Sequence, residues 1–198
     1  LFRSSVIGHQ PLQGAVLGQD ATQRTVVLQQ LGLVRDQHRG GAGFLRGAGD
    51  MRRIRMYSGR TGESLDTVYW VDGKYIREAL NEINIFMRDW RTGEVIGVDP
   101  RTVDVAAASH RLLQTNEPYM MLSGYRSPRT NAMLRRTSSG VARNSLHMSG
   151  KAADMRLKSR SVAQMYKAVT SCRAGGVGKY SRSNFVHMDC GPLRTWGG

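Results

Sequence analysis

Two histidines and two aspartates stand out in the strongly cationic second half of this 198-residue chain. From residue 122 to residue 198 there are fourteen lysines and arginines but only two acidic residues, Asp154 and Asp189. Asp154 follows His147 in "SLHMSGKAAD", and Asp189 follows His187 in "NFVHMDCG". Carboxylates that are scarce in a segment, and that each lie near an imidazole, are candidates for chemistry.

Three of these residues form a ligand set that suits a catalytic zinc ion (Zn²⁺). The two imidazoles of His147 and His187 and the carboxylate of Asp154 would leave the fourth tetrahedral position for water, whose pKa falls to about 7 on zinc. Their spacing is too long for one helix face, so the fold must bring them together. Such residues also occur as hydrogen-bonded structural groups, and the spacing alone leaves both interpretations open.

The distribution of charge limits the class of partner. The formal net charge is +14, and residues 123–198 alone sum to +12, whereas residues 61–122 are net acidic. This imbalance implies an anionic partner, with nucleic acid and cell-wall polymer as the two leading classes. Aromatic residues make up only 7% of the chain and no nucleic-acid reader motif is present, which argues against nucleic acid. No apolar run approaches transmembrane length, and no secretory leader is visible.

The elements that must position these side chains are predicted from residue 51 onward. Residues 1–48 lack sustained periodicity and run into the Gly-rich "HRGGAGFLRGAGD", so we predict a poorly ordered extension before a domain at 49–198. Strands are predicted at 52–58, 64–71, 119–123, 152–157 and 184–190. Helices are predicted at 75–90, 99–114, 127–136 and 160–172. This mixed order indicates a compact single α+β domain.

From about residue 51 to residue 196 the chain resembles the YcbK-like murein endopeptidase K family of zinc peptidases. The stretches that carry the resemblance are "TGESLDTVYWVDGKYI", "MRDWRTGEV", "SGYRSPRTNAMLRR", "SGVARNSLHMSGKAADMRL", "GGVGKY" and "FVHMDCGPLRTW", in that order. The family belongs to the fold group of D-Ala-D-Ala peptidases and the hedgehog signalling domain. The resemblance therefore implies a small central antiparallel sheet flanked by helices.

The resemblance also implies an activity and a site. It implies zinc held by His147, Asp154 and His187, in a peptidase that acts on peptidoglycan stem peptides and is periplasmic or cell-wall associated; a monomer is assumed. Arg126, in "SGYRSP", matches an arginine that faces the scissile carbonyl in related dipeptidases. A guanidinium there could stabilise an oxyanion or hold a substrate carboxylate.

One position departs from related enzymes. Carboxypeptidases of this fold group place a glutamate, the general base, three residues before the second histidine, where this chain has Asn184. Asp189 lies two residues after His187, on the same face if the segment is a strand. We expect Asp189 to act either as the general base or as a hydrogen-bond partner of a ligating histidine.

Several alternatives stay open. A carboxypeptidase that trims stem peptides is the nearest rival to an endopeptidase. A basic wall-binding or nucleic-acid-binding module without catalysis is the rival from another class. Beside the site, Asn131 is expected to hold a loop, Tyr125 and Ser145 to pack around it, and "GGVGKY" to form a turn with close backbone packing.

Overall fold

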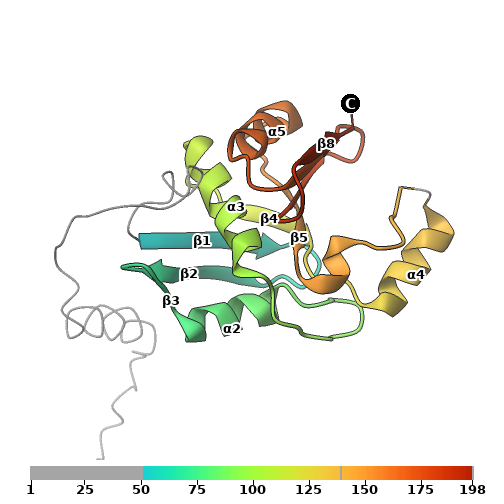
Figure 1. Ribbon diagram of the computed structural model, residues 1–198, viewed down its shortest axis with the longest axis horizontal. Helices are drawn as coiled ribbons and strands as arrows, with labels where there is room; N and C mark the ends of the chain where they lie inside the picture. Colours follow the sequence, from blue (N-terminus) through green and yellow to red (C-terminus); the bar gives the residue numbers. More distant parts are fainter. Residues whose placement is uncertain (1–50, 139, 198) are drawn as a thin grey trace, which may run out of the picture. The chain divides into compact units, whose positions relative to one another are not determined.

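A computed structural model describes residues 51–138 and 140–197 of the chain, so the predicted extension at 1–48 lies outside the described residues. These residues form one eight-stranded sheet in the order β3-β2-β1-β4-β5-β7-β6-β8, with helices packed against it (Figure 1). The strands are β1 (Met51–Ser58), β2 (Ser64–Val71), β3 (Lys74–Tyr75), β4 (Tyr119–Ser123), β5 (Ala152–Arg156), β6 (Gly176–Tyr180), β7 (Phe185–Asp189) and β8 (Arg194–Trp196). The helices are α2 (Arg77–Phe86), α3 (Pro100–Leu112), α4 (Pro128–Thr137), α5 (Val162–Ser171) and the short 3-10 helix η2 (Leu146–Ser149).

The α+β class is confirmed, but the sheet is larger than the small antiparallel sheet we predicted. It is also mixed, because β1 pairs with β4 and β6 pairs with β8 in parallel. Between β1 and β4 the chain passes through α2 and α3, which supplies the long connection that a parallel pair requires. Strands β3, β6 and β8 were not predicted, because β3 and β8 have only two and three residues and β6 is rich in glycine.

The helix starts follow from local hydrogen bonds that the sequence predicts. The side chain of Asp99 accepts a hydrogen bond from the backbone N–H of Arg101, and Pro100 occupies the first turn of α3. Ser127 caps α4 in the same way, by accepting from the N–H of Thr130. The cap at Ser127 matters for the site because it ends the loop that carries Arg126.

The two faces of the sheet have different roles. Along β5 and β7, Ala153, Met155, Val186 and Met188 alternate onto one face, where they are at most 1% exposed and join the apolar core beneath α3 and α5. Burying the valine and each of the methionines contributes about 1.5–3 kcal/mol. Because strand side chains alternate, the residues between them must project from the opposite face, and these are the polar residues of the site.

Two further features of the described chain bear on its class. No described helix has the length and apolar character needed to cross a membrane. Cys172 and Cys190 are both free thiols, the first buried and the second half-buried.

Candidate metal centre

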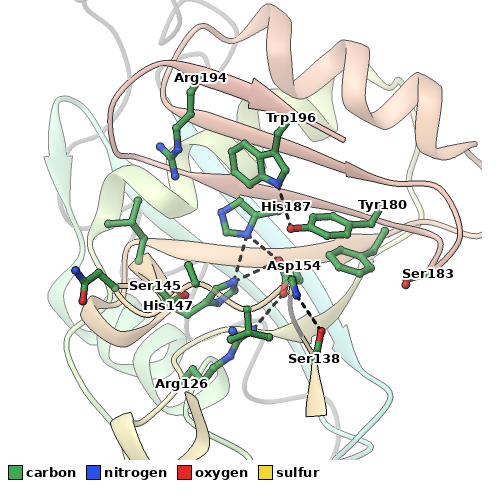
Figure 2. Close-up of a pocket in the computed structure, with 16 residues that line it drawn as sticks. Arg126, Ser138, Ser145, His147, Asp154, Tyr180, Ser183, His187, Arg194 and Trp196 are labelled. Carbon is green, nitrogen blue, oxygen red and sulfur yellow. Dashed lines mark hydrogen bonds and ion pairs between the residues drawn. The ribbon is translucent and has the colours of Figure 1, made fainter. Parts of the chain in front are cut away.

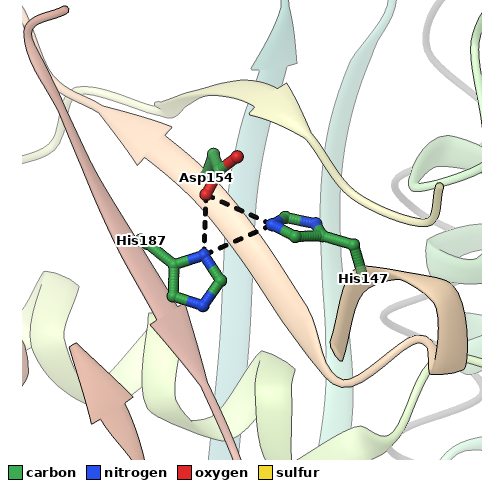
Figure 3. A group of neighbouring side chains, drawn as sticks. All are labelled: His147, Asp154 and His187. Atoms are coloured by element: carbon green, nitrogen blue, oxygen red, sulfur yellow. Dashed lines mark hydrogen bonds and ion pairs between the residues drawn. The ribbon is translucent and has the colours of Figure 1, made fainter. Parts of the chain in front are cut away.

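The sheet register brings two of the predicted ligands together. Strands β5 and β7 run antiparallel with Asp154 opposite His187, so both side chains project side by side from the same face. The third, His147, reaches them from η2, whose start is capped by the side chain of Ser145. Figure 3 shows the three side chains converging from these separate elements.

The ligand atoms of the three residues lie within 4.8 Å of one another. Asp154 Oδ1 is 2.9 Å from His187 Nδ1 and 3.3 Å from His147 Nε2, and the two nitrogens are 3.3 Å apart. All three side chains are buried. The predicted set therefore meets at one point.

Hydrogen bonds on the far side of each ring determine which nitrogen carries a proton. His147 Nδ1 is 2.7 Å from the carbonyl oxygen of Gly124, which can only accept, so Nδ1 donates and Nε2 presents a lone pair. His187 Nε2 is 3.0 Å from Asp189 Oδ2, so in the neutral ring Nδ1 presents a lone pair. Two lone pairs and a carboxylate then face one another, an arrangement that a cation between them stabilises. The donor set and its outer hydrogen bonds fit zinc.

The pKa values of His187 and Asp154 also indicate that the cluster stabilises positive charge. Burial lowers the pKa of His187, but hydrogen bonds to Asp154 and Asp189 outweigh burial and raise the pKa to about 9. Burial also opposes ionisation of Asp154, yet the two imidazoles hold its pKa well below the usual range. A metal ion at this point would compete with the proton for the same lone pairs.

The structure places Asp189 behind His187 rather than in the open site. Its side chain is fully buried and accepts hydrogen bonds from the backbone N–H groups of Gly176 and Gly191, both at 2.9 Å. Arg194 donates to it at 2.6 Å. Of the two roles expected for Asp189, this placement favours orienting His187, because a carboxylate so enclosed has no open path to a substrate water.

Arg126 lies at the other side of the ligand set. Its Nη2 is 3.5 Å from Asp154 Oδ2 and 3.3 Å from Ser123 Oγ. Its Nε is buried and has no hydrogen-bond partner among the described residues. The guanidinium therefore keeps donor capacity beside the ligands.

The loop that carries Arg126 is held by backbone contacts on both sides. Tyr125 is buried, and its N–H donates to the carbonyl of Met87 at 2.7 Å. The N–H of Ser127 donates at 2.9 Å to Asp89, a carboxylate that is 1% exposed. Sequence reasoning passed over Asp89, although it stands in the quoted stretch "MRDWRTGEV". Asp89 fixes the loop and hence the position of the arginine.

Asn131 contacts the chain segment beside the site, as expected. Its side-chain amide donates to the carbonyls of Ala142 and Arg143, at 3.1 and 3.3 Å. Both residues belong to the segment that leads into η2, so this contact ties α4 to that segment.

A hollow of about 470 Å³ opens over the ligands (Figure 2). One wall is aromatic: the rings of Tyr180 and Phe185 stack with centroids 4.4 Å apart, and Trp196 Nε1 donates to the Tyr180 hydroxyl at 3.0 Å. The Trp196 ring also lies 5.1 Å from that of His187. Arg126 and Arg194 contribute positive charge to the lining. The hollow can therefore hold a peptide with both apolar and anionic groups.

Two glycines of β6 make room for this wall. A Cβ atom at Gly178 would lie 2.6 Å from the Trp196 ring, and one at Gly176 would lie 2.5 Å from Arg194 and Asp189. The close packing predicted for "GGVGKY" is confirmed, although the segment is a strand and not a turn. Tyr180, Arg194 and Trp196 were not singled out from sequence; their only signal was their place in the quoted stretches "GGVGKY" and "FVHMDCGPLRTW".

An α+β fold with a possible His–Asp–His metal site beneath an open, arginine-lined hollow is compatible with the class of metal-dependent hydrolases. Comparison with known proteins gives the family. The family model described as peptidoglycan L,D-endopeptidase MepK matches residues 46–196, and the chain belongs to this family. It is therefore a peptidase, and the resemblance seen in the sequence is confirmed.

The relatives agree with the family model. The chain is 43% identical over 136 residues to peptidoglycan L,D-endopeptidase MepK of Escherichia coli K12. The aligned region covers 69% of this chain and 75% of that protein. It is 40% identical over 139 residues to the probable peptidoglycan L,D-endopeptidase MepK of Haemophilus influenzae. This aligned region covers 70% of this chain and 75% of the relative.

Proposed function

We propose that this protein is a zinc-dependent endopeptidase that hydrolyses peptide cross-links between peptidoglycan stem peptides, in the periplasm or at the cell wall. The observation that carries the proposal is the convergence of three metal-ligand atoms beside Arg126 in an open hollow. The relatives' names supply the substrate. The α+β architecture is compatible with the D-Ala-D-Ala peptidase and hedgehog fold group, to which we assign it.

Each residue of the site has a defined task in this proposal. His147 Nε2, Asp154 Oδ1 and His187 Nδ1 would hold the zinc ion, which would supply Lewis acidity and an acidified water. Gly124 and Asp189 keep the two imidazoles in the tautomers that present these nitrogens. The ligands are thus oriented before substrate arrives, and metal binding would displace the proton that His187 otherwise holds.

Arg126 acts on the substrate. Its guanidinium lies within 3.5 Å of Asp154 and retains an unpaired buried Nε. A fixed cation next to the reacting carbonyl stabilises negative charge that develops on its oxygen. Because the loop is held at Met87 and Asp89, the guanidinium needs little reorganisation during the reaction.

The shape of the site favours an endopeptidase over the carboxypeptidase alternative. A second hollow, also about 470 Å³, shares Asp154, Ser183 and Phe185 with the first. An enzyme that cuts within a cross-link must accommodate chain on both sides of the amide, whereas one that trims an end needs room on one side. Two hollows that share lining residues at Asp154 are compatible with the first requirement.

The test combines metal analysis with digestion. We expect one zinc ion per chain by elemental analysis, lost in His147→Ala and in His187→Ala. Purified peptidoglycan digested by the native protein should release uncross-linked muropeptides by mass spectrometry, and a chelator should abolish their release until zinc is added back. His110→Ala serves as the control, because His110 lies on α3 and contacts Glu117, away from the hollow.

Two outcomes would contradict the proposal. Digestion by carefully prepared protein that contains no transition metal would reject the zinc mechanism. Stoichiometric zinc without any digestion would instead indicate a wall-binding protein that keeps the metal as structure.

A further inference from the structure

Apart from Asp154, the side chains that line the second hollow have no assigned role in the chemistry above. Its lining comes from the β1–β2 turn, from residues 120–123 at β4, and from Asp154, Arg156, Ser183 and Phe185. The first hollow lies over η2 and strands β6 to β8. In the sheet order, β5 stands between these two groups of strands, so Asp154 marks the boundary between the hollows. A peptide that crosses the metal centre therefore enters both.

Arg156 lies directly beside the proposed metal ligands in this second hollow. It follows Asp154 by two residues on β5, so its side chain projects from the same face about 6.5 Å further along the strand. Its Nε donates to the sulfur of Met120 at 3.1 Å, a weak acceptor. Among the described residues, no carboxylate forms an ion pair with it. Arg156 thus presents donors to the hollow without a charged partner of its own.

A second arginine lines the same hollow. The guanidinium of Arg60, in the β1–β2 turn, lies 5.5 Å from the Trp90 ring and likewise pairs with no carboxylate in the described part of the chain. Arg60 and Arg156 therefore bring two positive charges to this hollow, where Asp154 is the one described acidic residue of the lining.

We propose that Arg156, assisted by Arg60, binds a carboxylate of the cross-linked stem peptide on the residue next to the cleaved amide. The planar fork of a guanidinium matches a carboxylate bidentately, and the short distance along β5 places that carboxylate close to the scissile bond. This inference rests on the proposed function, because it names the group that the same site recognises. It makes Arg156 a specificity-determining residue.

The experiment pairs two substrates with matched variants. One cross-linked muropeptide carries a free carboxylate on the residue next to the scissile amide, and the other carries a carboxamide there. We expect the zinc-loaded full-length protein to favour the carboxylate form by about 10-fold or more in kcat/KM, the usual effect of a charge-assisted hydrogen bond. Arg156→Gln should remove this preference, mainly through KM, and Arg156→Lys should keep part of it.

The control is Arg111→Gln, an exposed arginine on α3, which packs on the opposite side of the sheet. It should leave the substrate preference intact, and melting temperatures should show that all variants fold. The subsite is rejected if Arg156→Gln lowers turnover of both substrates equally, or if the native protein treats them alike.

Binding separates this inference from the proposed function. Analogues with a methylene-amine in place of the scissile amide cannot be cleaved, and calorimetry gives their Kd in carboxylate and carboxamide forms. Arg156-dependent preference for the carboxylate analogue supports the subsite even if no cross-link is digested. Digestion of cross-links together with equal Kd values for both analogues rejects the subsite and leaves the proposed function standing.

Discussion

At the scale of single residues, the hydrogen bond between His187 Nε2 and Asp189 determines which nitrogen of His187 faces Asp154. A carboxylate can only accept, so it keeps the ring proton on Nε2 and leaves Nδ1 free for a metal. The same carboxylate is anchored by two backbone N–H groups and by Arg194. Its orientation is therefore rigid, and so is the ring that it holds.

The variant Asp189→Asn tests the orienting role. An amide nitrogen can donate to His187 Nε2, which would move the ring proton to Nδ1, where it blocks the metal. We expect zinc affinity to fall by about 10- to 100-fold, the usual cost of losing such a partner, and excess zinc to restore activity. Zinc titration monitored by peptidoglycan digestion measures both quantities.

A different outcome would restore the general-base role. Full zinc occupancy with turnover reduced by about 100-fold or more would mean that Asp189 takes part in proton transfer. Normal occupancy with normal turnover would exclude both roles.

At the scale of elements, β6 shows how glycines within a strand can shape a site. Gly178 lies opposite both His187 on β7 and Trp196 on β8, so the indole crosses above the glycine toward the imidazole. The hydrogen bond from Trp196 to Tyr180 then joins the wall into one unit. The absence of a Cβ at Gly178 is thus a requirement of the hollow.

Gly178→Ala is the matching prediction. The added methyl group would approach the indole to 2.6 Å and force Trp196 outward. We expect the free energy of unfolding to fall by about 1–3 kcal/mol, the range for an overpacked site, with a change in tryptophan fluorescence and weaker substrate binding. Gly97→Ala is the control, because a Cβ there meets nothing within 4 Å. An unchanged melting temperature and spectrum for Gly178→Ala would show that the wall is not packed as described.

At the scale of the whole molecule, positive charge and the site occur in the same half of the sequence. The second half carries nearly all of the net charge of +14 and also supplies every proposed ligand. The first part of the domain contributes β1 to β3, α2 and α3, which build the core and hold the loop of Arg126. Most of the scaffold named here and most of the net positive charge thus come from different stretches of the chain.

Truncation tests the predicted domain boundary. The family match begins at residue 46, and every residue of the proposed site lies within it. We expect a protein that lacks residues 1–48 to keep its melting temperature and its zinc, as measured by thermal unfolding and elemental analysis. A large drop in melting temperature would show that the removed residues contribute to the core.

What the sequence determined by itself was mainly local. The caps at Asp99 and Ser127, the strand alternation of β1 and β2 and the scarcity of carboxylates near His147 and His187 can all be read within a few residues. Hydrogen bonds and periodicity over such short spans depend little on the rest of the fold. The ligand set could therefore be predicted, with the help of the family resemblance.

Only the tertiary structure decided how these pieces meet. The parallel pairing of β6 with β8, the burial of Asp189 behind His187 and the position of Asp154 opposite His187 all depend on strands that are distant in sequence. Such pairings are determined by packing across the whole sheet. Glycine-rich or three-residue strands also have no hydrophobic periodicity from which they could be predicted. The types of the proposed site residues could be predicted from the sequence, whereas the position of each one around the site could not.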